Sequence, residues 1–190
     1  MSIPNFITLC RLILTPVIIW LILEREVHWA FWLFVIAGVS DALDGLIAKQ
    51  FDRATQLGAY LDPIADKALL VSIYVTLGMI GELPGWLVML VVSRDLLIVG
   101  GVLLSFTLGY RLAMQPLMIS KANTVAQITL AGLVLAQLGL SLAFLEPIVF
   151  YLLYLTAVTT AISGCAYIID WVGVMSAAES DLGRQDDSGE

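Results

Sequence analysis

The chain has 190 residues, of which 60% are apolar and 13% are charged, against about 45–50% and about 25% in a typical soluble domain. So small a body cannot hide that apolar excess from water, which excludes an ordinary soluble domain and indicates an integral membrane protein. The net charge of −7 does not suggest a nucleic-acid partner, because such proteins need basic patches.

Six stretches of the chain are apolar and long enough to cross the hydrocarbon core of a bilayer as helices, which takes about 20 residues. In chain order they cover residues 6–23, 29–48, 60–80, 84–108, 124–145 and 147–169. The first stretch has neither a basic leader nor a small-residue cleavage site, so we expect a retained span and not a signal peptide. The predicted fold class is an all-α integral membrane protein with six transmembrane helices.

The basic residues that flank the spans predict their orientation, because such residues are enriched on the cytoplasmic side. With the N-terminus inside, the cytoplasmic segments carry six basic residues and the outer loops carry only Arg25. The six are Arg11, Lys49, Arg53, Arg111, Lys121 and Arg184. We therefore expect a cytoplasmic N-terminus. We also expect residues 1–175 to form one membrane domain, and the Gly-, Ser- and Asp-rich residues 176–190 to form a disordered acidic cytoplasmic tail.

Four aspartates interrupt the second and third spans, where a charge is expensive. They are Asp41, Asp44, Asp62 and Asp66. Each pair is spaced three or four residues apart and would share one face of a helix. A short connection between the two spans would let those faces meet as an antiparallel hairpin. Four converging carboxylates would repel one another, so two of them would have to be protonated unless cations lie between them. An oxygen-only ligand set favours Mg²⁺, Mn²⁺ or Ca²⁺. Two divalent ions would balance the four charges.

The residues near these aspartates indicate phosphate chemistry. Gly45 lets another group approach the helix backbone, and Lys49 lies one turn further on. Thr55 offers a hydroxyl, and Gly58 opens the third span. Metal ions, a basic side chain and exposed backbone are suited to holding a pyrophosphate and stabilising the charge released on its cleavage.

The pattern Asp41-x2-Asp44-Gly45-x2-Ala48-Lys49-x8-Gly58-x3-Asp62-x3-Asp66 resembles the signature of the CDP-alcohol phosphotransferases. These membrane enzymes displace CMP from a CDP-linked lipid with the hydroxyl of an alcohol. Further similarities favour the branch of the phosphatidylglycerophosphate and cardiolipin synthases: Pro4-Asn5-x2-Thr8-x2-Arg11, Ser93-Arg94-Asp95 and Ser120-Lys121-x-Asn123-Thr124-x2-Gln127. The chain departs from the family at Lys49, where arginine is usual and offers a bidentate phosphate contact.

The resemblance implies a bundle with a cytoplasm-facing active site. Asp41, Asp44, Asp62 and Asp66 would bind two Mg²⁺ or Mn²⁺ ions, and Asp66 would also take the proton from the acceptor hydroxyl. Contacts to CDP-diacylglycerol would come from Gly45, Lys49, Thr55 and Gly58. The resemblance also implies a homodimer and, for so compact a chain, a multi-pass protein of the bacterial inner membrane.

The acceptor alcohol stays open between glycerol-3-phosphate and phosphatidylglycerol, which both present a primary hydroxyl near a phosphate. Candidate acceptor contacts are Arg94, Arg111 and Lys121, although Lys121 could instead extend to the membrane interface. Arg94 and Asp95 are adjacent, so we expect them to point to different faces of their helix and pair with other helices. Arg11 could hold an acceptor phosphate, and Lys67 could pair with an acid or contact substrate.

Two alternative functions remain. One is a transferase for another polar alcohol such as inositol phosphate, serine or choline. The other, from a different class, is an ion-coupled transporter that uses the intramembrane carboxylates. A transporter does not need the glycines and the basic residue at fixed spacing from the aspartates, and no inverted repeat is evident.

Overall fold

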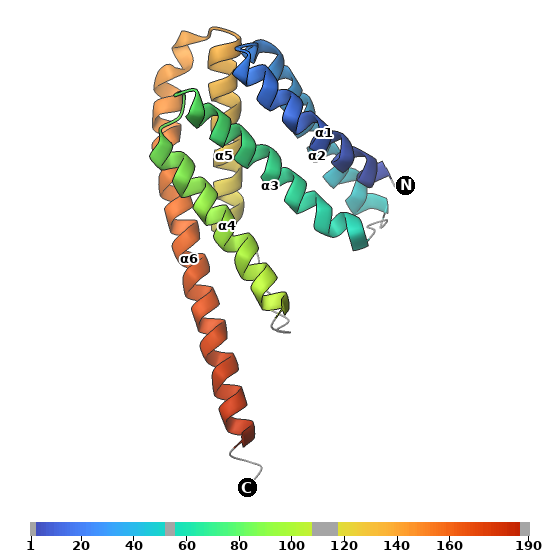
Figure 1. The fold of residues 1–190 in the computed structure, drawn as a ribbon, viewed down its shortest axis with the longest axis vertical. Helices are drawn as coiled ribbons and strands as arrows, with labels where there is room; N and C mark the ends of the chain where they lie inside the picture. The colour runs from blue at the N-terminus through green and yellow to red at the C-terminus, as the bar shows by residue number, and fades with distance from the viewer. Residues whose placement is uncertain (1–2, 52–55, 108–117, 187–190) are drawn as a thin grey trace.

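The computed structural model describes residues 3–51, 56–107 and 118–186, and within them the chain is entirely helical (Figure 1). Side-chain surroundings are described for residues 10–40, 67–101 and 118–172. The helices are α1 (Ile3–Leu23), α2 (Val27–Phe51), α3 (Gln56–Met79), α4 (Gly85–Thr107), α5 (Met118–Gly139) and α6 (Glu146–Asp186), with a short 3-10 helix, η1 (Ala143–Leu145), before α6. The all-helical architecture expected from the sequence is confirmed.

The ends of α5 and α6 differ clearly from the expected spans. Helix α5 ends at Gly139 and not near residue 145, because Ser141 adopts a left-handed backbone conformation (φ 55°) that ends the helix. Helix α6 continues to Asp186, although we expected residues 176–190 to be disordered. Figure 1 shows α6 extending well past the other helices. Ala177 and Ala178 are strong helix formers, and the helix propagates through them from a long apolar segment.

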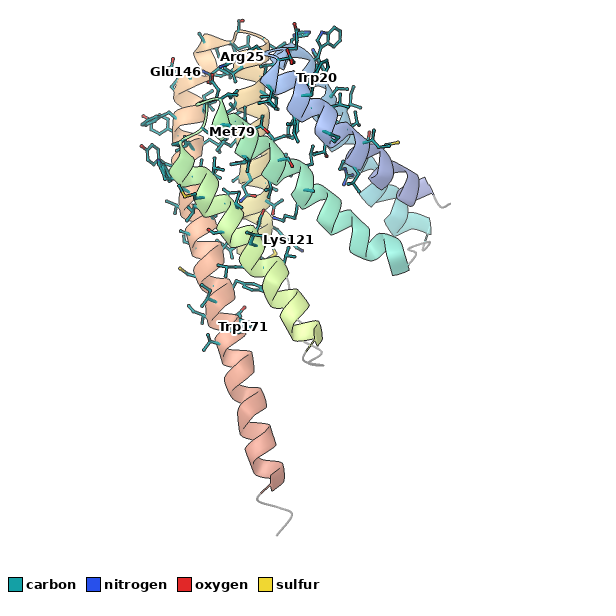
Figure 2. The ribbon with its side chains drawn as sticks, in the orientation of Figure 1. Trp20, Arg25, Met79, Lys121, Glu146 and Trp171 are labelled. Atoms are coloured by element: carbon teal, nitrogen blue, oxygen red, sulfur yellow. The ribbon has the colours of Figure 1, made fainter. Side chains whose placement is uncertain are left out.

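Three turns close one end of the bundle in the same way. Each has one residue with positive φ, namely Arg25, Gly81 or Ser141. The amide of the next residue then donates to a carbonyl five residues earlier in the preceding helix, at 2.9–3.1 Å, as in a Schellman motif. These bonds are Glu26 N to Leu21 O, Glu82 N to Leu77 O, and Leu142 N to Gln137 O. Figure 2 labels Arg25 and Glu146, which both lie at this end of the bundle.

Helix α1 packs against both α2 and α3, and α5 packs against α2, α3 and α6. Helix α4 completes the bundle by packing against α3 and α6. In the part of the chain that the structure describes, α2 and α3 do not contact each other directly. The expected meeting of their aspartate segments involves side chains outside the described residues and stays a prediction.

The distribution of side chains is that of a lipid-embedded bundle. Large apolar side chains are exposed on the outside, among them Met79 (75%) and Tyr151 (74%). Charged Arg11, Arg94 and Asp95 are buried inside. Exposed apolar surface of this extent would aggregate in water, whereas in a bilayer it faces lipid.

By length and composition, two helices of the described chain could cross a membrane, within Met118–Gly139 and Ala143–Val172. The apolar segments described in α1, α2 and α3 are shorter: Cys10–Leu23, Val27–Ser40 and Lys67–Met79. Six transmembrane helices are therefore not established by the described residues alone.

Gly139 lies where α5 approaches the start of α2, and replacing it by alanine should destabilise the bundle. An added Cβ would be 2.8 Å from the carbonyl oxygen of Val27 and 3.0 Å from His28 Cα. These are backbone atoms that cannot rotate away, so we expect a loss of about 1–3 kcal/mol in the free energy of unfolding. Gly100→Ala is the matched control, because nothing lies within 4 Å of its added Cβ. Thermal unfolding in detergent compares the two, and equal effects would contradict this close approach.

Candidate functional site

The residues predicted to bind metal and CDP lie on two helices. Positions 41, 44, 45 and 49 belong to α2, and positions 58, 62 and 66 belong to α3. The side chains of these residues lie outside the described part of the chain, as do Thr55 and Arg111 altogether. Among the described side chains, no group of three or more His, Cys, Asp or Glu gathers to hold a metal ion. The four-aspartate site therefore stays a prediction.

A buried ionic cluster joins four helices beside these positions. One oxygen of Asp95, Oδ1, accepts a hydrogen bond from Lys67 Nζ at 2.8 Å and another from Arg94 Nη1 at 2.7 Å. The guanidinium of Arg94 also donates to Ser120 Oγ of α5 at 2.6 Å and to Ser163 Oγ of α6. Arg94 and Asp95 are 3% and 4% exposed. We expected these two adjacent side chains to point apart, but the flexible arginine turns back onto its neighbour.

A second polar contact joins α5 to α6. The amide oxygen of Asn123 accepts hydrogen bonds from the hydroxyls of Thr159 at 2.9 Å and Thr160 at 2.8 Å. Tyr74 of α3 donates its hydroxyl hydrogen to the carbonyl oxygen of Gln127 at 3.1 Å. Because lipid offers no competing hydrogen bonds, such contacts hold membrane helices in register. They form a stable frame behind the ionic cluster.

A cavity of about 200 Å³ lies between α1, α2, α3 and α5. Its walls are mostly apolar, but three polar side chains line it, namely Arg11, Lys67 and Thr124. That volume equals about six or seven water molecules at liquid density, enough for one small polar group. The cavity is therefore a candidate for part of a substrate site.

The cavity lies on the helix faces that carry the predicted metal ligands. Ala37 of α2 lines the cavity, and positions 41 and 44 follow it at the four- and seven-residue spacing of one helix face. Leu70 of α3 also lines the cavity, and positions 66 and 62 precede it by four and eight residues. On a regular helix these spacings share a face, so we expect the aspartates to lie toward the cavity.

Lys121 lies exposed on α5, one residue after Ser120 of the ionic cluster (Figure 2). Thr124, three residues further on, lines the cavity. All three of these residues belong to the motif Ser120-Lys121-x-Asn123-Thr124. Ser163 was not predicted, because its only signal was a hydroxyl within an otherwise apolar segment of α6, where polar side chains tend to bond across helices.

Comparisons with known proteins agree in the family that they indicate. A family model described as CDP-alcohol phosphatidyltransferase matches residues 1–171. The chain is 32% identical over 195 residues to a Drosophila melanogaster protein named probable cardiolipin synthase (CMP-forming), covering 90% of this chain and 58% of that protein. It is 33% identical to the Homo sapiens protein named cardiolipin synthase (CMP-forming), covering 87% and 60%. It is also 33% identical to an Oryza sativa subsp. japonica protein named CDP-diacylglycerol–glycerol-3-phosphate 3-phosphatidyltransferase 1, chloroplastic, covering 90% and 57%. The chain thus spans 57–60% of the length of these three relatives.

Ser163→Ala should destabilise the bundle more than Ser93→Ala. Ser163 is 1% exposed and accepts two hydrogen bonds from Arg94, at 2.7 and 3.2 Å. Its loss leaves buried guanidinium donors unsatisfied, at a cost of about 1–3 kcal/mol. Ser93 is exposed and bonds only to a carbonyl of its own helix, that of Leu90, so its replacement should change stability by less than about 0.5 kcal/mol. Unfolding midpoints in the same detergent give the comparison. Equal midpoints would mean that the Arg94 contacts do not hold α4 to α6.

Proposed function

Because the chain belongs to the CDP-alcohol phosphatidyltransferase family, we propose that it transfers the phosphatidyl group of CDP-diacylglycerol to a glycerol-type alcohol and releases CMP. The observation that carries this proposal is the family match over residues 1–171, which contains every aspartate of the pattern. The acceptor is glycerol-3-phosphate, giving phosphatidylglycerophosphate, or phosphatidylglycerol, giving cardiolipin. The names of the relatives include both activities.

The donor atoms fit a site for divalent metal ions. Aspartate oxygens are ligands that Mg²⁺ and Mn²⁺ accept, and the four aspartate positions lie on two helices, α2 and α3, that both contribute residues to one polar-lined cavity. Asp41, Asp44, Asp62 and Asp66 would hold two such ions. When bound, the ions would neutralise charge on the pyrophosphate and on the departing CMP.

The other predicted residues would bind the donor and move one proton. Gly45, Lys49, Thr55 and Gly58 would hold the CDP group. The carboxylate of Asp66 would accept the proton of the acceptor hydroxyl as that oxygen bonds to the phosphatidyl phosphorus. The bond from that phosphorus to the bridging oxygen would break, and CMP would leave with this oxygen. Arg111 and Lys121 would guide an anionic acceptor by charge.

The membrane arrangement is also part of the proposal. Six spans would place the three closed turns on the outer side and the aspartate segments near the cytoplasm, with the N-terminus inside. The large exposed apolar surface supports burial in a bilayer. A bacterial inner membrane and a homodimer follow from the resemblance in sequence, and the mass of the purified protein in detergent tests the dimer.

Purified protein should release CMP from CDP-diacylglycerol only when an acceptor and a divalent ion are both present. EDTA should abolish this release, and Mg²⁺ or Mn²⁺ should restore it, because the four carboxylates cannot converge without cations. Thin-layer separation of products from labelled glycerol-3-phosphate and labelled phosphatidylglycerol identifies the acceptor. Transfer that continues unchanged in chelator would refute the metal site, and no CMP with any acceptor would refute the transferase.

Asp66→Asn should separate proton transfer from metal binding when compared with Asp62→Asn. An amide oxygen still coordinates metal weakly but cannot take a proton. We expect Asp66→Asn to retain most Mn²⁺ affinity while its single-turnover rate falls by about 10²–10⁴-fold. Asp62→Asn, one turn away on α3, should lose metal affinity and rate together. Near-normal turnover in Asp66→Asn would assign the base elsewhere, and metal loss equal to that of Asp62→Asn would remove the evidence for a base role.

A further inference from the structure

Three buried polar side chains between α5 and α6 carry atoms that hydrogen-bond to no other described residue. Asn123, Gln127 and Thr156 are each 0% exposed. Within the described part of the chain, the unpartnered atoms are the amide nitrogen of Asn123, both amide atoms of Gln127 and the hydroxyl of Thr156. A buried polar group without a partner is unfavourable, and most such groups in native proteins bond to protein or to ordered water. These atoms therefore need a hydrogen-bonding partner.

The register of α5 against α6 places the three side chains at neighbouring levels. The two helices are joined by a short connection and lie side by side in opposite directions (Figure 1). Asn123 of α5 accepts hydrogen bonds from Thr159 and Thr160 of α6. One turn further along α5 is Gln127, and one turn back along α6 is Thr156. In an antiparallel pair these two steps lead in the same direction, so Gln127 and Thr156 lie at one level.

Helix α3 closes this region on a third side. The hydroxyl of Tyr74 donates to the backbone carbonyl of Gln127 at 3.1 Å, and Tyr74 is itself 0% exposed. Leu130 and Ala131, about one turn further along α5, are also fully buried. Although Gln127 and Thr156 lie at one level, no hydrogen bond joins their side chains. A partner for these atoms is therefore enclosed by α3, α5 and α6.

The donors and acceptors of the region fit water better than an ion. The amide nitrogens of Asn123 and Gln127 are donors, the amide oxygen of Gln127 is an acceptor, and the hydroxyl of Thr156 is both. A cation would be repelled by the amide nitrogens, and an anion by the amide oxygen. Neither charge would be balanced, because none of the three side chains is ionisable. Water supplies two hydrogens and two lone pairs, and a buried water typically makes about three hydrogen bonds.

We propose that Asn123, Gln127 and Thr156 form an internal water site between α3, α5 and α6. The water accepts a hydrogen bond from an amide nitrogen of α5 and donates one to the hydroxyl oxygen of Thr156 on α6. It extends the direct contact between Asn123 and α6 by one helical turn. The site is independent of the transferase function, but α5 also carries Ser120 of the ionic cluster and Thr124 of the cavity. The water thereby helps to hold both residues in place.

Direct observation of the full chain in lipid tests the site. A crystal structure at a resolution that shows ordered water should contain a peak about 2.7–3.2 Å from the amide nitrogen of Gln127 or Asn123 and from Thr156 Oγ1. The peak should be present without CDP-diacylglycerol or metal, because none of these atoms belongs to the proposed reaction centre. Side chains that turn to bond one another directly, with no peak between them, would overturn the proposal. The arrangement described above without a peak would overturn it as well.

The stability of variants gives a second test, because apolar replacement has different effects in a hydrated site and in a dry one. Thr156→Val keeps the shape of the side chain and removes the hydroxyl, and Gln127→Met keeps the length and removes the amide. In a hydrated site each variant leaves the water with fewer partners, so the Tm of the full chain in detergent should fall by about 2–8 °C. In a dry site each variant removes an unsatisfied buried group, so the Tm would stay the same or rise.

Thr129→Val is the matched control. The hydroxyl of Thr129 donates to the carbonyl of Val125 in its own helix, at an exposed position, so its loss should change the Tm by less than about 2 °C. The double variant Thr156→Val with Gln127→Met should lose less than the sum of the two single losses, because both remove bonds to the same water. An unchanged or raised Tm in both single variants would contradict the water site, as would strictly additive losses.

Discussion

The buried carboxylate of Asp95 is the constraint on which the arrangement of α3 to α6 depends. A single oxygen of this side chain holds Lys67 of α3 and Arg94 of α4, and Arg94 extends the contact to serines of α5 and α6. Removing one member of a buried ion pair typically costs about 3–5 kcal/mol, because the remaining charge has no water to solvate it. The four helices can therefore change their relative positions only by breaking several charged hydrogen bonds together.

The two ends of the bundle differ in what holds them. At one end, three turns with positive φ are closed by backbone hydrogen bonds, and Gly139 lets α5 approach the backbone of α2. Halfway along, the Asn123 and Tyr74 contacts hold α5 against its neighbours. The aspartate positions lie on α2 and α3 beyond this frame. A rigid frame behind a reaction centre positions its side chains better than loops can.

Unlike a soluble protein, the bundle exposes large apolar side chains and buries charged ones, and the proposed chemistry agrees with this distribution. Apolar side chains such as those of Met79 and Tyr151 face outward, where lipid would surround them and where the lipid donor of the proposed reaction would enter. The proposed reaction would handle a pyrophosphate and a proton, which agrees with charged side chains such as Arg94 and Asp95 inside the bundle. Membership of the family connects this arrangement with phosphatidyl transfer.

Periodicity and apolar runs were sufficient to predict six helices, because crossing a bilayer requires every backbone hydrogen bond to be made within a helix. The spacing of Asp41, Asp44, Asp62 and Asp66 likewise predicted shared helix faces, and the motif that contains them indicated the family by resemblance. Tertiary structure alone decided that Lys67 pairs with Asp95, that Arg94 turns back onto its neighbour, and that Ser163 completes the cluster. These contacts join residues 28 to 69 positions apart or depend on the rotamer of a long side chain. Local sequence cannot specify either, because both depend on which helices pack together and on the burial of charge between them.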